Sequence, residues 1–375
     1  MDFDFSDDQV SLRDAVQRWV EKGFTFDRRH GIAKAGGATR AVYSELAELG
    51  LTGLAVPESQ GGMGFGAVEA MVVCEELGRG LVNAPFAEAA LMVPALLAAA
   101  PAELQAAWLP RVASGETLLV PALQEQGSRY RLAHVGTHAK AHGSDWMLTG
   151  VKSVVPAGDE ADGWIVPARI SGKPEDSAGI GLFLVHRGAA KARGFPTQDG
   201  ARAAELTLAA TPATLITRDG HGALETAVDI ALAAQMAEAV GLMDKLVAIT
   251  VDYMNTRKQF NVHIASFQSL RHRIADVKMQ LELGRSMSYY ATLKLDEPTP
   301  QRRRAVSQAR VQLGQSMRFV SQQCIQLHGG IACTDEYIAS HYFKRLTMLE
   351  MSYGDSLHHL GEVSALMQDA AGVFA

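Results

Sequence analysis

The sequence predicts an α+β protein with a helical domain over residues 1–115, a β domain over residues 116–217 and a second helical domain over residues 218–375. Two changes in the spacing of hydrophobic residues predict this order. Up to about residue 113, and again from about residue 223, apolar side chains recur at the spacing of amphipathic helices. Between these stretches, short β-branched runs alternate with Gly, Pro and Asp, a pattern typical of strands and turns.

The first helix is predicted to begin at Ser6. Ser6 and Gln9 have the spacing of a capping box, in which each side chain bonds to the backbone N–H of the other residue. The apolar residues that follow at helical spacing are Val10, Val16, Trp19 and Val20. Further helices are predicted over residues 40–49, 66–78, 85–99 and 102–113. The glycine-rich stretch 61–66 is interpreted as a connecting loop, because no predicted strand precedes it as in a phosphate cradle.

The later elements follow the same reasoning. Residues 164–166 and 181–185 are predicted strands of the β domain. In the C-terminal domain, one apolar helical stripe comprises Leu224, Val228, Leu232, Met236 and Val240. A helix running from Gln301 is predicted to end at Gly329, because glycine readily adopts the left-handed conformation that ends many helices.

Composition excludes several classes of function. A chain of 375 residues with 47% hydrophobic content can bury a large core, and a net charge of −6 argues against a nucleic-acid or polybasic membrane surface. Cys74, Cys324 and Cys333 lack metal-ligand spacing and favour a reduced, cytoplasmic setting without a metal. The acidic N-terminus is unlike a signal peptide, and the longest apolar run, 89–100, is too short to span a bilayer and contains Pro94.

The most informative segment covers residues 253–278, YMNTRKQFNVHIASFQSLRHRIADVK. A helix is predicted to break at a short turn, residues 259–261, and then to resume, which brings Arg257, Phe260 and Gln268 together. The guanidinium fork can pair bidentately with a pyrophosphate, and an aromatic ring can cover an adenosine. The alternative is an ordinary helical corner with a surface arginine. Spacing alone does not separate a dinucleotide site from such a corner.

Three motifs, in the same order along the chain, resemble the acyl-CoA dehydrogenase family. The segment above resembles R-x-Q-F-(G)-x-x-I-x-x-F-Q, with Asn261 where most members have Gly, and Asn261 is expected to adopt a positive φ. The others are QLHGG at 326–330 and GLTGLAVPE at 50–58, followed by GGMG and EELG. The resemblance implies an N-terminal helical domain, a central β-barrel or sandwich and a C-terminal four-helix bundle. It also implies FAD-dependent α,β-desaturation of an acyl-CoA thioester, with electrons passed to an electron-transferring flavoprotein.

The resemblance also implies which residues would contact FAD. In family dimers, the first motif and the Q-x-x-G-G motif reach across to the pyrophosphate and adenosine held by the neighbouring subunit. The residues at these positions are Arg257, Phe260, Gln268, Gln326, Gly329 and Gly330. His328 lies between them, and its expected role is only a favourable interaction with the dipole at the end of its helix.

The catalytic base of the family has no counterpart in this chain. Family members carry a carboxylate at one of two places, which correspond here to Gly354 and Ala231. Asp355 lies one residue along the same loop and is a possible displaced base, although a surface or helix-capping role is the stronger interpretation. Asp229 lies two helical residues from Ala231 and would therefore point almost in the opposite direction. The sequence thus predicts no catalytic residue.

The positions that face the flavin ring are also altered. The family's T-E-P-x-x-G-S-D loop corresponds to residues 123–129, which keep only Glu125 and a Gly-Ser pair. The W-I-T stretch on the ring corresponds to residues 153–155, Ser-Val-Val. A threonine and a glutamine that hold the cofactor are replaced by Ser356 and His358. The chain therefore keeps elements that act on a neighbour's FAD and loses those that hold its own.

Three hypotheses follow from this division between retained and altered motifs. In the first, the chain is the FAD-clamping, base-lacking subunit of a heteromer that contains a related large subunit. In the second, it is a complete homotetrameric acyl-CoA dehydrogenase with Asp355 as the base. In the third, it is a non-enzymatic assembly or binding member of the family.

Overall fold

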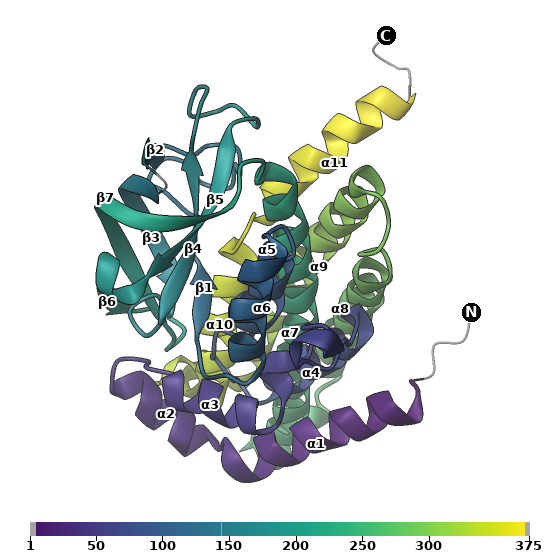
Figure 1. The fold of residues 1–375 in the computed structure, drawn as a ribbon. Coiled ribbons are helices and arrows are strands. Elements are labelled where there is room, and N and C mark those ends of the chain that lie inside the picture. The colour runs from purple at the N-terminus through teal and green to yellow at the C-terminus, as the bar shows by residue number, and fades with distance from the viewer. Residues whose placement is uncertain (1–4, 144, 372–375) are drawn as a thin grey trace. The chain divides into compact units, whose positions relative to one another are not determined.

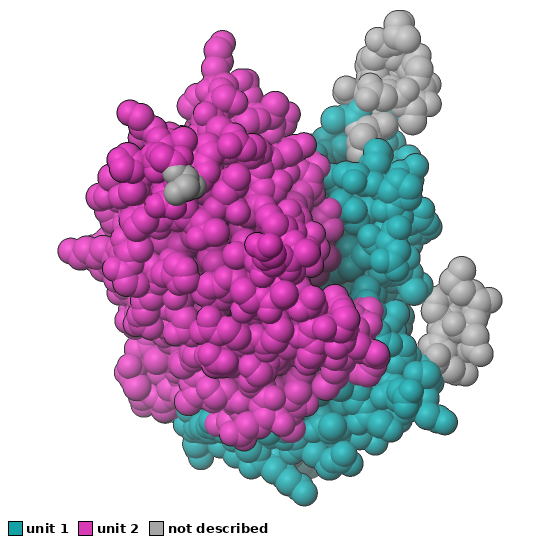
Figure 2. All heavy atoms as spheres, viewed as in Figure 1, with its two compact units in different colours: residues 1–29, 67–82, 232–375 teal, residues 30–66, 83–231 magenta. Residues whose placement is uncertain are grey.

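The protein is described by a computed structural model that covers residues 5–143 and 145–371. These residues cluster into two compact units (Figure 2). The helical unit comprises residues 1–29, 67–82 and 232–375, and the barrel unit comprises residues 30–66 and 83–231. The predicted boundaries of three domains, at residues 115 and 217, stay a prediction.

The helical unit is built from long helices (Figure 1). They are α1 (Asp7–Gly23), α4 (Ala67–Arg79), the larger part of α7 (His221–Thr256), α8 (Gln268–Leu293), α9 (Thr299–His328), α10 (Ile338–Met351) and α11 (Ser356–Ala371). The predicted capping box at the start of α1 is confirmed. The backbone N–H of Gln9 donates to Ser6 Oγ at 3.2 Å, and that of Ser6 donates to Gln9 Oε1 at 3.0 Å.

Two glycines allow α4 and α7 to approach closely. A Cβ built on Gly78 would lie 2.2 Å from the carbonyl oxygen of Glu238, and one on Gly241 would lie 1.9 Å from that of Glu75. Neither distance leaves room for a side chain. The backbones of the two helices therefore meet directly at this point.

A charged cluster is buried beside this helix pair. Glu75 is 1% exposed, and its Oε2 lies 3.8 Å from Arg13 Nη2 and 3.7 Å from Arg285 Nη1. Its Oε1 accepts no hydrogen bond within the described residues. Burial raises the pKa of Glu75, against the opposing effect of Arg285 and Arg13. Burial and the two guanidinium groups therefore act on the pKa of this carboxyl group in opposite directions, and the effect of burial is the larger one.

The helix α7 is, within the described residues, the one helix that is long and apolar enough to cross a membrane. However, 89% of its most apolar window is buried inside the protein. Such burial is typical of a core helix, and Ala231, Met236 and Val240 are fully buried in it.

The helix α9 ends where the sequence predicts. His328 is its last residue, and Gly329 has a φ of +70° and a ψ of −150°. This conformation has a positive φ but is not the left-handed helical one, and it is essentially restricted to glycine. Cys324 and Met317, on the same helix, are buried core residues.

In the barrel unit, short helices precede the strands. These are α3 (Arg40–Glu48), α5 (Val93–Leu97) and α6 (Ala102–Ala113), while α2 (Phe26–Lys34) crosses from the helical unit. The helix predicted over residues 85–99 is present, but its first part, Ala87–Met92, is a π-helix. Its wider turn is a feature that hydrophobic spacing does not reveal.

Seven strands form the β-barrel. They are β1 (Leu119–Pro121), β2 (His138–His142), β3 (Asp145–Pro156), β4 (Gly163–Arg169), β5 (Ile180–His186), β6 (Lys191–Pro196) and β7 (Arg202–Thr217). The pairings β4–β2–β3–β7–β5–β4 close a ring, with β1 added to β4 and β6 added to β7. The predicted strands at 164–166 and 181–185 lie in β4 and β5. The sequence analysis left a barrel and a sandwich open, and the closed ring of strands shows that the domain is a barrel.

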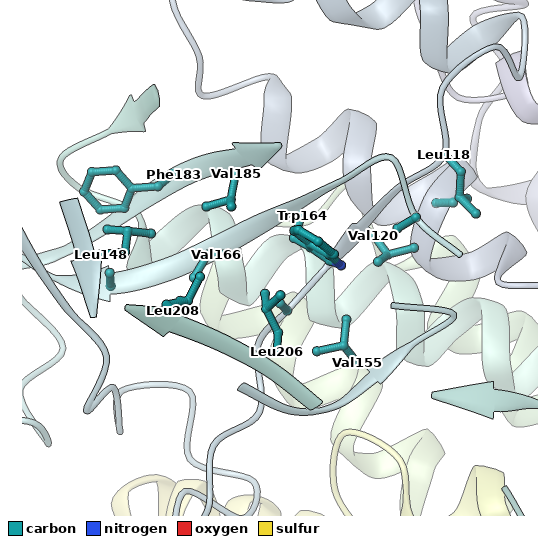
Figure 3. Close-up of a cluster of buried hydrophobic side chains, with 14 of the residues drawn as sticks. Leu118, Val120, Leu148, Val155, Trp164, Val166, Phe183, Val185, Leu206 and Leu208 are labelled. Atoms are coloured by element: carbon teal, nitrogen blue, oxygen red, sulfur yellow. The ribbon is translucent and has the colours of Figure 1, made fainter. Parts of the chain in front are cut away.

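The inside of the barrel is a continuous apolar core (Figure 3). Trp164 lies within it at 1% exposure, and its indole N–H donates to the carbonyl of Gly158 at 2.9 Å. Around it pack side chains from β1, β3, β4, β5 and β7, among them Val120, Leu148, Val155, Val166, Phe183, Val185, Leu206 and Leu208. A buried tryptophan with a satisfied N–H stabilises the barrel closure.

Candidate functional site

The segment between α7 and α8 forms a β-hairpin. Strand β8 (Lys258–Gln259) pairs with β9 (Val262–His263) in antiparallel register, so that only Phe260 and Asn261 form the turn. Their φ angles are +52° and +65°. Two positive φ values are typical of a type I′ turn, for which Asn is well suited and Phe is not. The positive φ predicted at Asn261 is confirmed, and Phe260 shares it at a steric cost.

A small buried cluster fixes the base of the hairpin. Met254 from the end of α7, Ile264 from the return of the hairpin and Leu327 from the last turn of α9 pack together. The backbone N–H of Ile264 donates to the carbonyl of Arg257 at 2.9 Å and closes the hairpin. Leu327 lies next to Gln326. The cluster therefore brings the two sequence motifs of this region, 257–268 and 326–330, to one place in the helical unit.

All six predicted cofactor-binding residues are exposed at this place. They are Arg257, Phe260, Gln268, Gln326, Gly329 and Gly330. Phe260 is 87% exposed at the tip of the hairpin, and its ring meets that of Phe267 edge-to-face, with 6.3 Å between centroids. Within the described residues, the Arg257 guanidinium makes no ion pair or side-chain hydrogen bond. The structure thus offers a free guanidinium and a free aromatic face on one surface.

Other basic side chains accompany Arg257 on this surface. Lys258, His263 and Arg271 are exposed on the same hairpin and on the first turn of α8. Such a group attracts an anion, and the guanidinium fork adds bidentate geometry for a phosphate. These donors fit the pyrophosphate of FAD, and the exposed ring fits its adenosine.

His328 is an interior group of this region. It is 4% exposed, its Nδ1 lies 2.8 Å from the carbonyl oxygen of Cys324, and its ring packs against Tyr253 and Tyr337. Burial lowers the pKa of His328. A neutral ring contributes packing and one hydrogen bond at the helix end rather than the charge–dipole interaction that the sequence suggested.

The loop at Gly354 leaves no space for a base. Arg310 is fully buried beneath it and donates to the backbone carbonyls of Leu349, Ser352 and Gly354. Gly354 has a φ of +122°, and a Cβ built on it would lie 2.4 Å from His359 Nε2. The volume that a side chain would need here is therefore filled by imidazole. Burial and the nearby Arg310 lower the pKa of His359 to about 3, so this ring is neutral and a poor proton acceptor.

Asp355 caps a helix. Its Oδ1 accepts a hydrogen bond from the backbone N–H of His358 at 2.8 Å, at the start of α11. Its carbonyl accepts from the backbone N–H of His359 at 3.1 Å. A carboxylate at this position satisfies an otherwise free donor and interacts favourably with the helix dipole. The geometry agrees with the capping interpretation of Asp355.

The two residues that replace the family's cofactor-holding pair are also engaged within the protein. The Ser356 hydroxyl donates to Glu350 Oε1 at 2.9 Å, and it lies so close to Gly314 that a Cβ there would be 1.9 Å from it. His358 meets the His359 ring with 5.1 Å between centroids. Ala231, the second possible base position, is fully buried in α7, and Asp229 is 2% exposed.

In the barrel unit, a buried ion pair organises the loop that corresponds to T-E-P. Lys152 is fully buried, and its Nζ lies 2.5 Å from Glu125 Oε1. Glu125 also accepts from the backbone N–H of Gly136 at 2.7 Å and of Thr137 at 3.0 Å. Burial lowers the pKa of Lys152 to about 8 despite Glu125. Burial acts to raise the pKa of Glu125, but Lys152 and the Thr137 hydrogen bonds hold it below its usual value.

Sequence reasoning missed this ion pair, although a lone lysine within an apolar strand was a signal for it. Next to it, the backbone N–H of Ser153 donates to the carbonyl of Gln124 at 2.8 Å, which joins the loop to β3. A bulge follows, where Val154 has a φ of +50° and is 43% exposed. A positive φ is a marked outlier for a β-branched residue. The loop and strand predicted to face a flavin ring are therefore adjacent, and the strand is strained.

Comparison with known proteins agrees with this arrangement. Models described as the N-terminal and C-terminal domains of acyl-CoA dehydrogenase match residues 6–116 and 218–365. Acryloyl-CoA reductase (NADH) of Anaerotignum propionicum is 24% identical over 96% of this chain and 94% of its own. The mitochondrial long-chain specific acyl-CoA dehydrogenase of Sus scrofa is 26% identical, over 89% and 80%.

Two solved structures are similar over nearly the whole chain. A variant of the Tcur3481-Tcur3483 steroid ACAD has a TM-score of 0.87 at 28% identity, covering 98% of this chain and 99% of its own. The ChsE4-ChsE5 complex from Mycobacterium tuberculosis has a TM-score of 0.86 at 26% identity, covering 99% of each chain. Motifs, barrel, helices and these matches lead to one assignment. The chain belongs to the acyl-CoA dehydrogenase family.

Proposed function

We propose that this chain is the FAD-clamping, base-lacking subunit of a heteromeric acyl-CoA dehydrogenase. One observation carries the proposal: Gly354 has no room for a side chain, and the adjacent carboxylate of Asp355 caps a helix. A general base must come within hydrogen-bond reach of the proton that it removes. In this proposal, a related large subunit supplies that base and the contacts to the flavin ring.

This chain contributes binding and orientation to the shared site. Arg257 pairs with the pyrophosphate, Phe260 covers the adenosine, and Gln268 and Gln326 supply amide hydrogen bonds. FAD, when bound, accepts the β-hydride of the acyl-CoA thioester, and its electrons pass to an electron-transferring flavoprotein. The exposure of Arg257 and Phe260 in the isolated chain supports a role in which their ligand is held by another subunit.

The comparisons support a heteromer and suggest one substrate class, and a sequence resemblance suggests a second. Two similar structures each carry a name that pairs two components, Tcur3481-Tcur3483 and ChsE4-ChsE5, and the first is described as a steroid ACAD. Residues 196–200 (PTQDG) and 342–347 (YFKRLT) resemble the small subunit of pimeloyl-CoA dehydrogenase. A steroid side-chain or dicarboxylyl-CoA thioester is accordingly the proposed substrate of the cytoplasmic complex.

Flavin stoichiometry tests the proposal. A dimer of two family subunits has two symmetric FAD places, each of which needs a ring-holding half and a clamping half. If this chain only clamps, the mixed dimer binds one FAD, and the heterotetramer carries half the flavin of a homotetramer. The measurement is flavin absorbance against protein concentration in the co-purified complex, with the chain purified alone as the control.

The flavin content of the isolated chain and of the complex distinguishes the three hypotheses. A nearly colourless isolated chain and one FAD per mixed dimer support the clamping subunit. One FAD per subunit in the isolated chain would support the homotetramer with Asp355 as base. A chain that binds no flavin and no related subunit would support the non-enzymatic member.

A further inference from the structure

The loop that follows α9 buries almost none of its residues. Seven of the eight residues from 329 to 336 are exposed. A Cβ built on Gly329 or Gly330 would meet no atom within 4 Å, so the backbone of both glycines is open to close approach by a ligand. Within the loop, the carbonyl of Ile331 accepts from the backbone N–H of Thr334 at 3.1 Å and from its hydroxyl at 2.9 Å. A loop with so few buried contacts keeps one conformation only where other elements hold it.

Two side chains of α10 hold the far end of this loop through Asp335. The carbonyl oxygen of Asp335 lies 2.8 Å from His341 Nε2, and its carboxylate accepts from Lys344 Nζ at 3.0 Å. His341 and Lys344 are three residues apart and therefore share a face of α10. The helix is itself fixed to α4, because the Tyr342 hydroxyl donates to the carbonyl of Arg79 at 2.6 Å. The loop is thus attached at Asp335 to a helix that is anchored within the helical unit.

His341 is the buried member of this attachment. It is 4% exposed, and its ring meets that of Phe26 edge-to-face, with 5.1 Å between centroids. Its Nδ1 contacts Nη1 of Arg29, which is 3% exposed in α2. A guanidinium can only donate hydrogen bonds, and a carbonyl can only accept them. Nδ1 must therefore accept from Arg29, and Nε2 must carry the proton that it donates to Asp335.

These two partners require a neutral imidazole in one tautomer. A protonated ring would place a hydrogen on Nδ1 against the guanidinium of Arg29, and the other neutral tautomer would have no proton for the carbonyl of Asp335. Burial lowers the pKa of His341, and the charges of Arg29 and Lys344 act in the same direction, against the opposing effect of Asp335. The imidazole therefore connects a buried guanidinium on one side to the exposed loop on the other.

We propose that His341 is a positioning residue for FAD binding, which holds the loop 329–336 through the carbonyl of Asp335 in the conformation that receives the pyrophosphate. The inference rests on the proposed function, because it takes Gly329 and Gly330 to lie against FAD. The contribution of His341 is to order the loop before FAD binds. Binding to a loop that is ordered in only a fraction of the molecules is weakened by that fraction. Loss of the His341 hydrogen bonds should thus weaken binding on the order of 10-fold.

Three substitutions of His341 separate its hydrogen bonds from its volume and from a possible charge. His341→Gln keeps an oxygen that accepts from Arg29 and an N–H that donates to Asp335. His341→Leu keeps bulk without either group, and His341→Arg can donate but cannot accept from Arg29. Tyr342→Phe is the matched control, because it removes a hydrogen bond from the neighbouring residue of α10 that is directed to α4 and not to the loop.

Amide hydrogen exchange in the flavin-free, full-length chain is the first readout. Exchange in residues 329–336, where the Thr334 amide is bonded to Ile331, should be on the order of 10-fold faster in His341→Leu and His341→Arg. His341→Gln and Tyr342→Phe should exchange near the wild-type rate. If His341→Leu fails to fold, the contrast between His341→Gln and His341→Arg gives the same test. Wild-type exchange in His341→Arg, or an equal increase in Tyr342→Phe, would overturn the proposal.

The FAD affinity of the co-purified complex is the second readout. The Kd should rise on the order of 10-fold in His341→Leu and should stay within about two-fold of the wild type in His341→Gln and Tyr342→Phe. If Arg257→Lys weakens FAD binding and His341→Leu does not, the positioning role is wrong while the proposed function stands. An unchanged Kd in both variants would contradict the proposed function itself, even where exchange in the isolated chain responds to His341.

Discussion

Replacing Gly354 by alanine tests whether the loop of the missing base is closed to any side chain. A non-glycine residue at a φ of +122° costs about 1–3 kcal/mol in backbone strain. Its Cβ would also lie 2.4 Å from His359 Nε2 and 2.7 Å from His358 Cδ2. Both distances are shorter than a van der Waals contact, and such overpacking costs about 1–3 kcal/mol. Gly354→Ala should therefore lower the free energy of unfolding by about 2–6 kcal/mol, and Gly354→Glu should create no base.

The assay is urea denaturation followed by circular dichroism, with Gly330→Ala as the matched control. A Cβ added to Gly330 would have no atom within 4 Å, and this glycine has no positive φ, so its substitution should leave the midpoint nearly unchanged. In a His359→Ala background, the cost of Gly354→Ala should fall, because the strain remains while one overlap is removed. A loss below about 0.5 kcal/mol in Gly354→Ala, the usual range of a neutral surface change, would refute the closed loop.

Three further outcomes follow from the described contacts. Arg257→Lys should weaken FAD binding in the complex by about 1.5–3 kcal/mol, because a point charge cannot replace a bidentate fork; an unchanged Kd would contradict the clamp. Asp355→Asn should keep turnover of the complex within a few-fold, since Asn also caps helices, whereas a fall of about 100-fold would place the base on this chain. The pKa of Glu75 is raised in the folded protein, so the folded state holds the proton to a higher pH than the unfolded state does. The free energy of unfolding of the wild type should therefore fall as the pH rises from the usual pKa of Glu toward the raised pKa. Glu75→Gln should remove this slope and raise the unfolding midpoint at pH 7; the same slope in both proteins would rule out Glu75 as its source.

Features set by neighbouring residues could be predicted from the sequence. The capping box at Ser6 and Gln9 depends on residues three apart, and the positive φ at Asn261 depends on one tight turn. The end of α9 at Gly329 depends on a single residue that tolerates its backbone angles. In each case the preference of a short segment agrees with the final fold, so tertiary packing had nothing to override.

Features set by distant residues could not be predicted in the same way. Lys152 and Glu125 are 27 residues apart and meet only because the loop folds back onto β3. The π-helix at Ala87–Met92 has the same apolar composition as an α-helix. The closure of the loop at Gly354 depends on Arg310, from another helix, and on His359. The sequence predicts that a base is missing, but it does not reveal that His359 occupies the space beside Gly354.

The loop at Gly354 and the hairpin at Phe260 differ in how far their side chains are covered by the rest of the chain. At Gly354 the chain satisfies most groups internally: Arg310 bonds the carbonyls, Asp355 caps α11, and imidazole fills the space. The exceptions are Tyr353, which has a φ of +54°, and His359 Nε2, which is buried without a hydrogen-bond partner among the described residues. At the hairpin, Phe260 has a similar φ of +52°, but its apolar surface is 87% exposed. Strain of this kind persists where the surrounding structure imposes it and is concentrated at functional sites. A ligand or subunit that covers the ring would recover the free energy lost by its exposure, whereas Gly354 and His359 are already buried within the chain. This difference in exposure supports the proposal that the hairpin binds a cofactor and that another subunit supplies the base.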